Sequence, residues 1–477
     1  GTTVYSMDAA ERVSGLQDPV SSIQFLFNTN NGLVSRMTNA TSGIYADYAF
    51  NLLDQVTNLV WRKGDGTVLR SFAYSVNAVG LITNVLLETG TNVSYSYSEL
   101  DMLTREQRGT EYDISMGFDA VGNRTNMTSG GVTQTYSYQA GNNRLASWGL
   151  SGENTVLLDD AGCVTNLNYD GESVRGLTWN SLHQVAAIAT DAVVAETSGY
   201  DGAGRRVYIA QGTTTNWLVY DGVQVVAEVN GSGQLQKSYT WGSGIDNLLA
   251  LTTGHGTATT NTYYALTDHL GTVHALADSS GSVVESYRFD AWGRVLCVFN
   301  SSGVQITESA IGNRYLWQGR EYSWKTGLYF FRARWYDPVT GRWLSNDPIG
   351  ISGGLNQYAF CGNNPVNFRD PFGLCKKADG DANNLPQKSM LERLKENYDR
   401  LDDWTDGTLT DAILAILGPC QRRSDEELAA QLNMVMSSKT IRRLWEKAYN
   451  TPWPKNSSGR NFDVSHEPLP KADGGDD

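Results

Sequence analysis

Two aspartates, Asp347 and Asp370, have the residue type and the spacing of a paired carboxylate site. Each begins an Asp-Pro-x-Gly sequence, in which proline restricts the backbone. They lie 23 positions apart, far enough for the chain to return on a neighbouring strand, so both side chains can face one pocket. Two carboxylates held close together cannot both ionise at low cost, so one keeps its proton as an acid while the other acts as a base on water. The pair predicts hydrolysis of a peptide bond without a metal or a cofactor.

An ordinary turn is the alternative interpretation of each Asp-Pro-x-Gly sequence. Aspartate accepts hydrogen bonds from the backbone that follows it, and proline presets the backbone for a turn. Asp337, in Asp337-Pro338-Val339-Thr340-Gly341, is expected to form only such a turn. The aromatic residues of this region are expected to pack as a hydrophobic plug rather than to bind a ligand. They are Tyr315, Trp317, Tyr329, Phe330, Phe331, Trp335, Tyr336 and Trp343.

The residues that precede the aspartates carry a repeat of two alternating aromatics, a small polar residue, and then a glycine-containing turn. Examples of this repeat are residues 95–103, 118–124, 136–145, 200–206 and 289–295. Alternating aromatics lie on one face of a strand, and an Asp-x-x-Gly step supplies the turn, so each unit predicts one β-hairpin. A single hairpin is only marginally stable, so the units must pair side by side into a long sheet. We therefore expect a mostly β fold.

These repeats are tyrosine-aspartate (YD) repeats, and the chain resembles the Rhs (rearrangement hotspot) family, which is related to the C components of ABC toxin complexes and to teneurins. The resemblance covers residues 1–374 and is most specific in 264–276, 287–295 and 313–374, the last resembling the Rhs-repeat-associated core. It implies that the repeats wind into a hollow β-shell that encloses a variable C-terminal toxin. It also implies that the core plugs one end of the shell.

The same resemblance implies self-cleavage just after the Asp-Pro-x-Gly-Leu motif, which places the scissile bond here between Leu374 and Cys375. A third group comes with it, because family members carry an arginine before an aromatic-Tyr-Asp-Pro run. That position is Arg334 in this sequence. Its cation is expected to orient a carboxylate or to stabilise the developing oxyanion.

The composition changes after Leu374. Residues 1–374 contain three lysines, whereas residues 375–477 contain eight and almost none of the YD rhythm. Capping-box spacings at 389–392 and 424–427, followed by apolar residues at helical spacing, predict a small and mainly helical domain. We therefore predict three domains: a YD-repeat β-shell wall (1–312), an autoproteolytic plug (313–374) and a C-terminal effector (375–477).

The last residues of the effector contain an Asp-x-x-His step formed by Asp463 and His466. This segment resembles the opening of an HNH-type (ββα-metal) nuclease toxin, which implies His466 as general base or metal-side histidine, Asp463 in support, and a divalent metal. A solvated tail rich in proline and glycine explains the same residues. The segment from 375 onward is not basic, with 15 Lys and Arg against 18 Asp and Glu, although nucleic-acid binding favours clustered positive charge. Nucleic acid is expected only as a substrate of this effector.

The charge, cysteine spacing and apolar runs of the chain argue against several other classes of protein and of binding site. A net charge of −14 argues against a main body that binds nucleic acid. Five scattered cysteines without C-x-x-C spacing form neither a zinc site nor a disulfide framework. No apolar run reaches the ~18 residues that a membrane span needs, and no signal peptide is visible.

The predicted function is to enclose a toxic effector and then to free it by cleavage at the core aspartates, in competition between bacteria or against a host. The protein is expected to be secreted as a delivered effector, with a secretion or delivery component and a cognate immunity protein as partners besides its own enclosed effector. The alternative, from another class, is a YD-repeat cell-surface or adhesion protein whose core is structural and does not cleave.

Overall fold

The structure is a computed structural model that describes residues 3–19, 21–169, 173–257, 259–374 and 377–378. All of them belong to one compact unit, Gly1–Gln387. The second unit, Lys388–Asp477, lies outside the described residues. So do Cys375, the predicted effector helices, Asp463 and His466.

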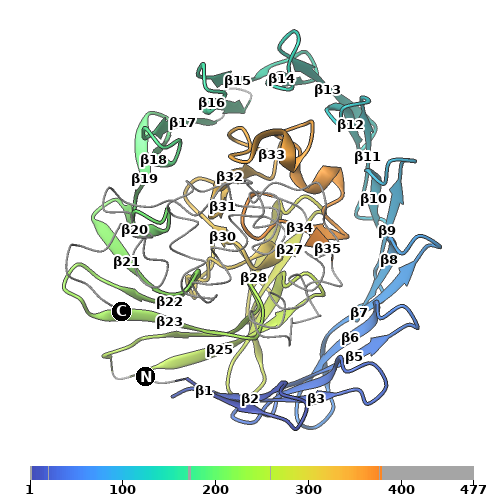
Figure 1. Cartoon of the computed structure of the whole chain (residues 1–477), viewed down its shortest axis with the longest axis vertical. Coiled ribbons are helices and arrows are strands. Elements are labelled where there is room, and N and C mark those ends of the chain that lie inside the picture. Colours follow the sequence, from blue (N-terminus) through green and yellow to red (C-terminus); the bar gives the residue numbers. More distant parts are fainter. Residues whose placement is uncertain (1–2, 20, 170–172, 258, 375–376, 379–477) are drawn as a thin grey trace, which may run out of the picture. The chain divides into compact units, whose positions relative to one another are not determined.

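A sheet of 29 strands, β1 to β29, makes up most of this unit (Figure 1). Every strand pairs antiparallel with its neighbours in the sequence, so the sheet is one continuous meander of hairpins. The first strands are β1 (Val4–Met7), β2 (Val13–Gln17), β3 (Ser22–Phe27), β4 (Val34–Asn39), β5 (Tyr45–Phe50), β6 (Val56–Arg62), β7 (Val68–Val76), β8 (Ile82–Leu87), β9 (Asn92–Tyr97), β10 (Leu103–Arg108), β11 (Tyr112–Phe118), β12 (Arg124–Ser129), β13 (Val132–Tyr138), β14 (Leu145–Gly149) and β15 (Asn154–Leu158). The remaining strands are β16 (Val164–Tyr169), β17 (Ser173–Trp179), β18 (Val185–Thr190), β19 (Val193–Tyr200), β20 (Arg206–Gln211), β21 (Thr214–Asp221), β22 (Gln224–Val229), β23 (Leu235–Trp241), β24 (Leu248–Thr253), β25 (Asn261–Thr267), β26 (Val273–Ala277), β27 (Val283–Phe289), β28 (Val295–Asn300) and β29 (Gln305–Ile306). The predicted sheet of YD-repeat hairpins is confirmed.

The Asp-x-x-Gly turns form as the repeat predicts. In the turn after β19, Oδ1 of Asp201 accepts hydrogen bonds from the backbone N–H of Ala203 (3.0 Å) and of Arg205 (2.9 Å). Gly204 has a φ of 77°, in the left-handed region that glycine adopts without steric cost. The aspartate therefore caps the turn and the glycine reverses the chain.

The aromatic residue before a turn ties its hairpin to the preceding one. The hydroxyl of Tyr200 donates to the carbonyl of Val185 (2.9 Å), and that of Tyr138 donates to the carbonyl of Arg124 (2.9 Å). A tryptophan does the same where Nε1 of Trp241 donates to the carbonyl of Val225 (2.7 Å). Each of these carbonyls lies in the second strand of the hairpin before, so the contact fixes the register between successive repeats.

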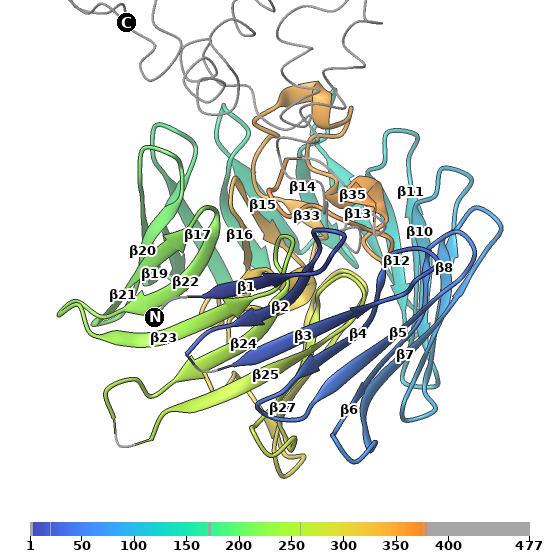
Figure 2. The same cartoon turned by 60° about the horizontal axis from the view of Figure 1, so that its bottom comes forward.

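The sheet curls until its late strands pack against its early ones (Figures 1 and 2). Side chains of β2 to β11 share one hydrophobic cluster with side chains of β24 to β26. Across this junction, Nε1 of Trp61 in β6 donates to the carbonyl of Thr267 in β25 (2.8 Å). The curl brings distant repeats together without closing the sheet, because β1 and β29 are not paired with each other in the described residues.

The segment predicted to be the plug follows β29 and lies inside the curve of the sheet (Figure 1). It contains η1 (Trp317–Gly319), β30 (Glu321–Tyr322), β31 (Tyr329–Phe331), β32 (Arg334–Asp337), β33 (Arg342–Trp343), η2 (Gly350–Gly353), η3 (Phe360–Asn363) and β34 (Phe368–Arg369), and β34 pairs with β35 (Lys377–Ala378). All eight aromatic side chains predicted to pack here are at most 4% exposed. Trp317 and Tyr336 stack with ring centroids 5.5 Å apart. The plug therefore has an aromatic core.

Asparagines anchor the plug to successive hairpin turns of the wall. Four side-chain amides donate to turn carbonyls, namely Asn346 to Ala161 (2.6 Å), Asn356 to Val121 (3.1 Å), Asn363 to Gly122 (2.7 Å) and Asn364 to Asp101 (2.8 Å). Asn367 instead accepts from the N–H of Ile82 (2.8 Å). These bonds fix the position of residues 346–367 relative to the wall.

Candidate active site in the plug

The three residues predicted to carry out cleavage meet in the plug. Arg334, the first residue of β32, places its Nη2 2.9 Å from Oδ2 of Asp347 and 3.5 Å from Oδ2 of Asp370. All three side chains are at most 4% exposed. One guanidinium nitrogen therefore lies between two buried carboxylates that the sequence separates by 23 positions.

The other nitrogens of Arg334 hold it in place. Nη1 donates to the carbonyl of Gln357 (2.9 Å), and Nε donates to the carbonyl of Gly373. The guanidinium also lies over the ring of Trp343, 4.2 Å from its centroid. Because several of its nitrogens are hydrogen-bonded, the guanidinium keeps a fixed orientation, which the single ammonium group of a lysine cannot do.

Asp347 uses its two oxygens differently. Oδ1 accepts a hydrogen bond from the N–H of Ile349 (3.0 Å), which forms a local turn, and Oδ2 faces Arg334. Burial raises the pKa of Asp347, and the guanidinium of Arg334 offsets only part of that effect. Burial also lowers the pKa of Arg334. The environment therefore favours the protonated form of Asp347 more than water does.

Asp370 closes a tight turn onto the residue before the predicted cut. Its Oδ1 accepts a hydrogen bond from the N–H of Leu374 (2.9 Å), and its backbone carbonyl accepts one from the N–H of Gly373 (3.2 Å). Gly373 has a φ of +69°, and a Cβ there would lie 2.7 Å from the carbonyl oxygen of Phe331. The motif needs glycine at this position because no larger residue fits.

The carbonyl oxygen of Leu374 and the carboxylate of Asp347 both border the space next to Gly353. A Cβ added to Gly353 would be 3.0 Å from that carbonyl oxygen and closer still to Oδ2 of Asp347. Gly353 therefore leaves open the space that both groups border. Beyond the predicted cut, Lys377 pairs with Arg369 and Ala378 with Phe368, so the chain turns back past the site.

This geometry contains the parts of an acid and base catalyst for peptide hydrolysis. It has a buried carboxyl whose pKa is raised by burial, a second carboxylate hydrogen-bonded to the N–H of Leu374, and a fixed cation between them. Sequence reasoning missed the roles of Gly353, Gln357 and Trp343 at this site. No side-chain signal could reveal Gln357, because it acts through its backbone carbonyl.

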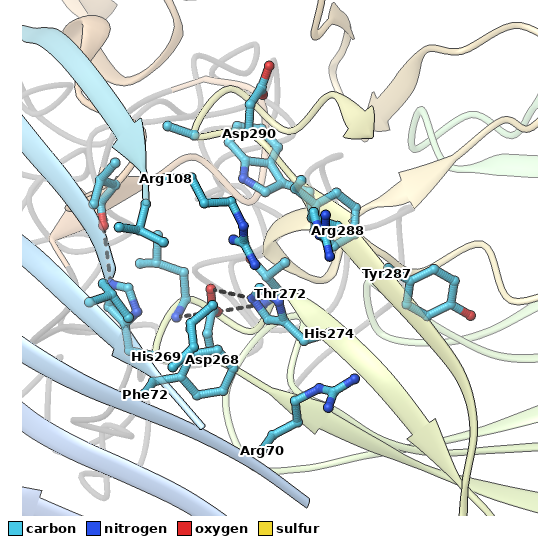
Figure 3. Close-up of a pocket in the computed structure, with 18 of the residues that line it drawn as sticks. Arg70, Phe72, Arg108, Asp268, His269, Thr272, His274, Tyr287, Arg288 and Asp290 are labelled. Carbon is cyan, nitrogen blue, oxygen red and sulfur yellow. Dashed lines mark hydrogen bonds and ion pairs between the residues drawn. The ribbon is translucent and has the colours of Figure 1, made fainter. Parts of the chain in front are cut away.

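A separate cavity of about 220 Å³ lies where the early strands meet the late ones (Figure 3). It does not contain the aspartates of the plug. Two histidines at this cavity are held by neighbours: His269 contacts the hydroxyl of Tyr74 (3.1 Å), and His274 contacts Asp268 (3.2 Å). No cluster of three His, Cys, Asp or Glu side chains suited to a metal occurs among the described residues. In the same part of the chain, no helix is long and apolar enough to cross a membrane.

Comparisons with known proteins agree with this fold. The teneurin YD-shell family model matches residues 108–366. The chain is 28% identical over 387 residues to the tRNA3(Ser)-specific nuclease WapA of Bacillus spizizenii, covering 78% of this chain and 16% of that protein. It is 24% identical over 336 residues to double-stranded DNA deaminase toxin A of Burkholderia cenocepacia, covering 65% of this chain and 23% of that protein.

A crystal structure of TcdB2-TccC3-TEV shares the fold, with a TM-score of 0.60 and 18% identity, covering 78% of this chain and 21% of that one. The chain thus spans less than a quarter of the length of each of these three proteins.

Proposed function

Because the chain belongs to the teneurin YD-shell family, we propose that it is the part of a polymorphic toxin that encloses an effector and cleaves itself between Leu374 and Cys375. The single observation that carries this proposal is the position of Arg334, whose Nη2 contacts the carboxylates of both Asp347 and Asp370. Ordinary turns give no reason to bury two carboxylates against one guanidinium beside a backbone carbonyl.

The roles of the two aspartates follow from their contacts. A water molecule attacks the carbonyl carbon of Leu374 and gives a proton to Asp370. Arg334 stabilises the negative charge of the developing oxyanion. Asp347, whose pKa is raised by burial, gives a proton to the departing amine of Cys375. The immediate products are a carboxylic acid at Leu374 and a free amino group at Cys375, with Asp370 protonated and Asp347 ionised. Transfer of the acid's proton to Asp347 leaves Leu374 as a carboxylate, so atoms and protons balance.

The segment released by this cut, residues 375–477, is proposed to be the effector. The two relatives carry the names of a tRNA nuclease and a DNA deaminase, which supports an enzymatic toxin here. The proposed nuclease site is Asp463 and His466 with a divalent metal. A delivery component and an immunity protein are proposed as partners. A secreted location is also proposed, because the protein is expected to be a delivered effector.

Carboxamide variants test the cleavage. The wild type, Asp347→Asn and Asp370→Asn are expressed as the full chain, and the fraction cleaved is measured on denaturing gels with intact mass. Asp337→Asn is the matched control, because Asp337 is also a buried aspartate before a proline, and its carboxylate accepts hydrogen bonds from its own turn. We expect cleavage of the wild type and the control, and intact chains of the other two.

An intact wild type, or cleavage that persists in both variants, would overturn this proposal. The first outcome would favour the surface or adhesion protein with a structural core. Toxicity of 375–477 with a His466→Ala control tests the effector separately.

A further inference from the structure

The wall loop between β23 and β24 carries a buried carboxylate, Asp246, that the proposed chemistry does not use. Its side chain is fully buried, and the residue has a φ of 61°, a left-handed conformation that is uncommon for residues other than glycine. Oδ1 of Asp246 lies 2.8 Å from Nη1 of Arg320 and 2.6 Å from Nη2 of Arg332. Oδ2 accepts a further hydrogen bond from Nη1 of Arg332 (2.9 Å). Asp246 therefore binds Arg332 through a bidentate ion pair, which fixes both the distance and the orientation of the guanidinium.

Arg332 in turn holds the segment that is to be cut. It occupies the tight turn between β31 and β32 with a φ of 62°. Its Nη1 also donates to the carbonyl of Pro371, and its guanidinium lies 5.2 Å from the ring centroid of Phe372. Gln224 of β22 accepts from Nη2 (3.0 Å), so a second wall residue supports the same guanidinium.

The turn that contains Arg332 binds three successive carbonyls of the cleavage segment. The carbonyl of Pro371 accepts from Arg332, that of Phe372 accepts from the N–H of Ala333 (3.1 Å), and that of Gly373 accepts from Arg334. The turn is thus a template for residues 371–373. It determines where the carbonyl of Leu374 lies relative to Asp347.

We propose that Asp246 is a positioning residue for self-cleavage and that it acts through Arg332. The peptide bond after Leu374 is then cleaved only once the wall loop has docked on the plug. The inference rests on the proposed cleavage and adds its regulation by assembly of the shell. Asp246 lies 86 positions before Arg332 in the sequence, but in space it contacts the template directly through this arginine. A chain whose wall has not formed lacks this contact, and its cleavage segment is not held in register.

A general docking role is the competing explanation, and the chain offers a matched control for it. Glu228 of β22 is also a buried wall carboxylate paired with a plug arginine, with Oε1 3.2 Å from Nε of Arg314. It makes none of the described contacts to residues 332–334 or 370–374. If cleavage needs only a docked plug, Glu228→Gln and Asp246→Asn will slow it alike.

The test measures the cleavage rate of the full chain by pulse-chase in cell-free translation. Asp246→Asn is expected to slow cleavage about 10- to 100-fold, the loss that small misplacements of reacting groups cause, while Glu228→Gln keeps the wild-type rate. Arg332→Gln is expected to be as slow as Asp246→Asn. Arg332→Lys is expected to restore part of the rate, because lysine keeps a cation and donors for Asp246 and Pro371.

The double variant Asp246→Asn with Arg332→Gln separates positioning from lost stability. Residues that act through one contact give non-additive effects, so the double variant is expected to be no slower than either single one. Thermal unfolding of each variant is followed in parallel, and the rate is expected not to follow the melting temperature across the set.

Three outcomes overturn the inference while leaving the cleavage proposal intact: a wild-type rate for Asp246→Asn, equal slowing by Glu228→Gln, or multiplied effects in the double variant. If Asp246→Asn does not fold, a rate of Arg332→Lys no higher than that of Arg332→Gln overturns the inference. An uncleaved wild type instead refutes the proposed cleavage itself.

Discussion

Nη2 of Arg334 lies 2.9 Å from Oδ2 of Asp347, and both side chains are almost completely buried. The contact stabilises the carboxylate, yet burial still raises the pKa of Asp347. The carboxyl of Asp347 therefore keeps its proton to a higher pH than a carboxyl in water, while Arg334 remains its partner. Such an arrangement suits a general acid better than a purely structural ion pair.

Replacement of Arg334 by lysine should slow cleavage strongly. Lysine keeps the charge but cannot contact both carboxylates, Gln357 and Gly373 together, as the arginine does. We expect a loss of about 100-fold or more, in the range found when one stabilising donor is removed from an active site. Pulse-chase measurement of the cleaved fraction checks this. A wild-type rate would mean that only the charge of Arg334 matters.

The rate of cleavage should fall as the pH rises through the raised pKa of Asp347. Burial raises the pKa of Asp347 above its ordinary value, so the proton that it donates is retained to higher pH and is lost as the pH passes through the raised pKa. The precursor is kept unfolded by urea from the time of its synthesis and is then refolded at a series of pH values. Its cleavage rate is followed by measuring the masses of the intact and cleaved chains. Circular dichroism at each pH controls for folding. A rate that rises steadily with pH would argue against Asp347 as the acid.

Gly373→Ala should impair cleavage through a direct clash. The φ of +69° alone costs an alanine about 1–2 kcal/mol, and its Cβ would also lie 2.7 Å from the carbonyl oxygen of Phe331. Gly66→Ala is the control, because Gly66 has a φ of +89° but no atom within 4 Å of the added Cβ. We expect cleavage to be slowed in the first variant and normal in the second. Equal rates would show that the register of residues 371–374 does not matter.

The junction between early and late strands should weaken as the pH rises. Burial, with the nearby charge of Asp290 as a second cause, raises the pKa of Glu106 to about 8, and burial also raises the pKa of Asp290. Because the folded state holds these protons more tightly than the unfolded chain, the stability that this pair contributes is fully present at low pH and is lost as the pH rises toward and through 8. Glu106 also accepts from the N–H of Ala291 (2.9 Å).

Thermal unfolding between about pH 5 and pH 9, a range that spans the two titrations, checks this expectation. The melting temperature of the wild type should fall across that range, and Glu106→Gln should flatten the dependence. A melting temperature that rises with pH would contradict the proposed titration of this pair.

The repeating part of the fold could be predicted from the sequence because its causes are local. An aspartate that caps a turn, a glycine in the left-handed region and alternating aromatics each act within a few residues, as in the turn of Asp201 and Gly204. The meeting of Asp347 and Asp370 was also predictable from their residue type and spacing, and the family resemblance added Arg334. Their proposed roles remain predictions.

The role of Asp246 could not be predicted, because its contacts depend on how the whole sheet curls. Its partners Arg320 and Arg332 lie 74 and 86 positions later in the chain, and the surrounding Gly-Ser-Gly-Ile-Asp sequence resembles any polar loop. The asparagine contacts from the plug to the wall turns have the same origin. Only a three-dimensional structure shows which turn each asparagine reaches.

The measurement that tests self-cleavage most directly is the intact mass of the purified full chain under denaturing conditions, with sequencing of any new amino terminus. We predict two polypeptides in place of one of 52.3 kDa, the second beginning at Cys375, and a single uncleaved species for Asp370→Asn. A wild-type chain that remains whole after folding, or a new amino terminus at any other residue, would contradict self-cleavage at this bond.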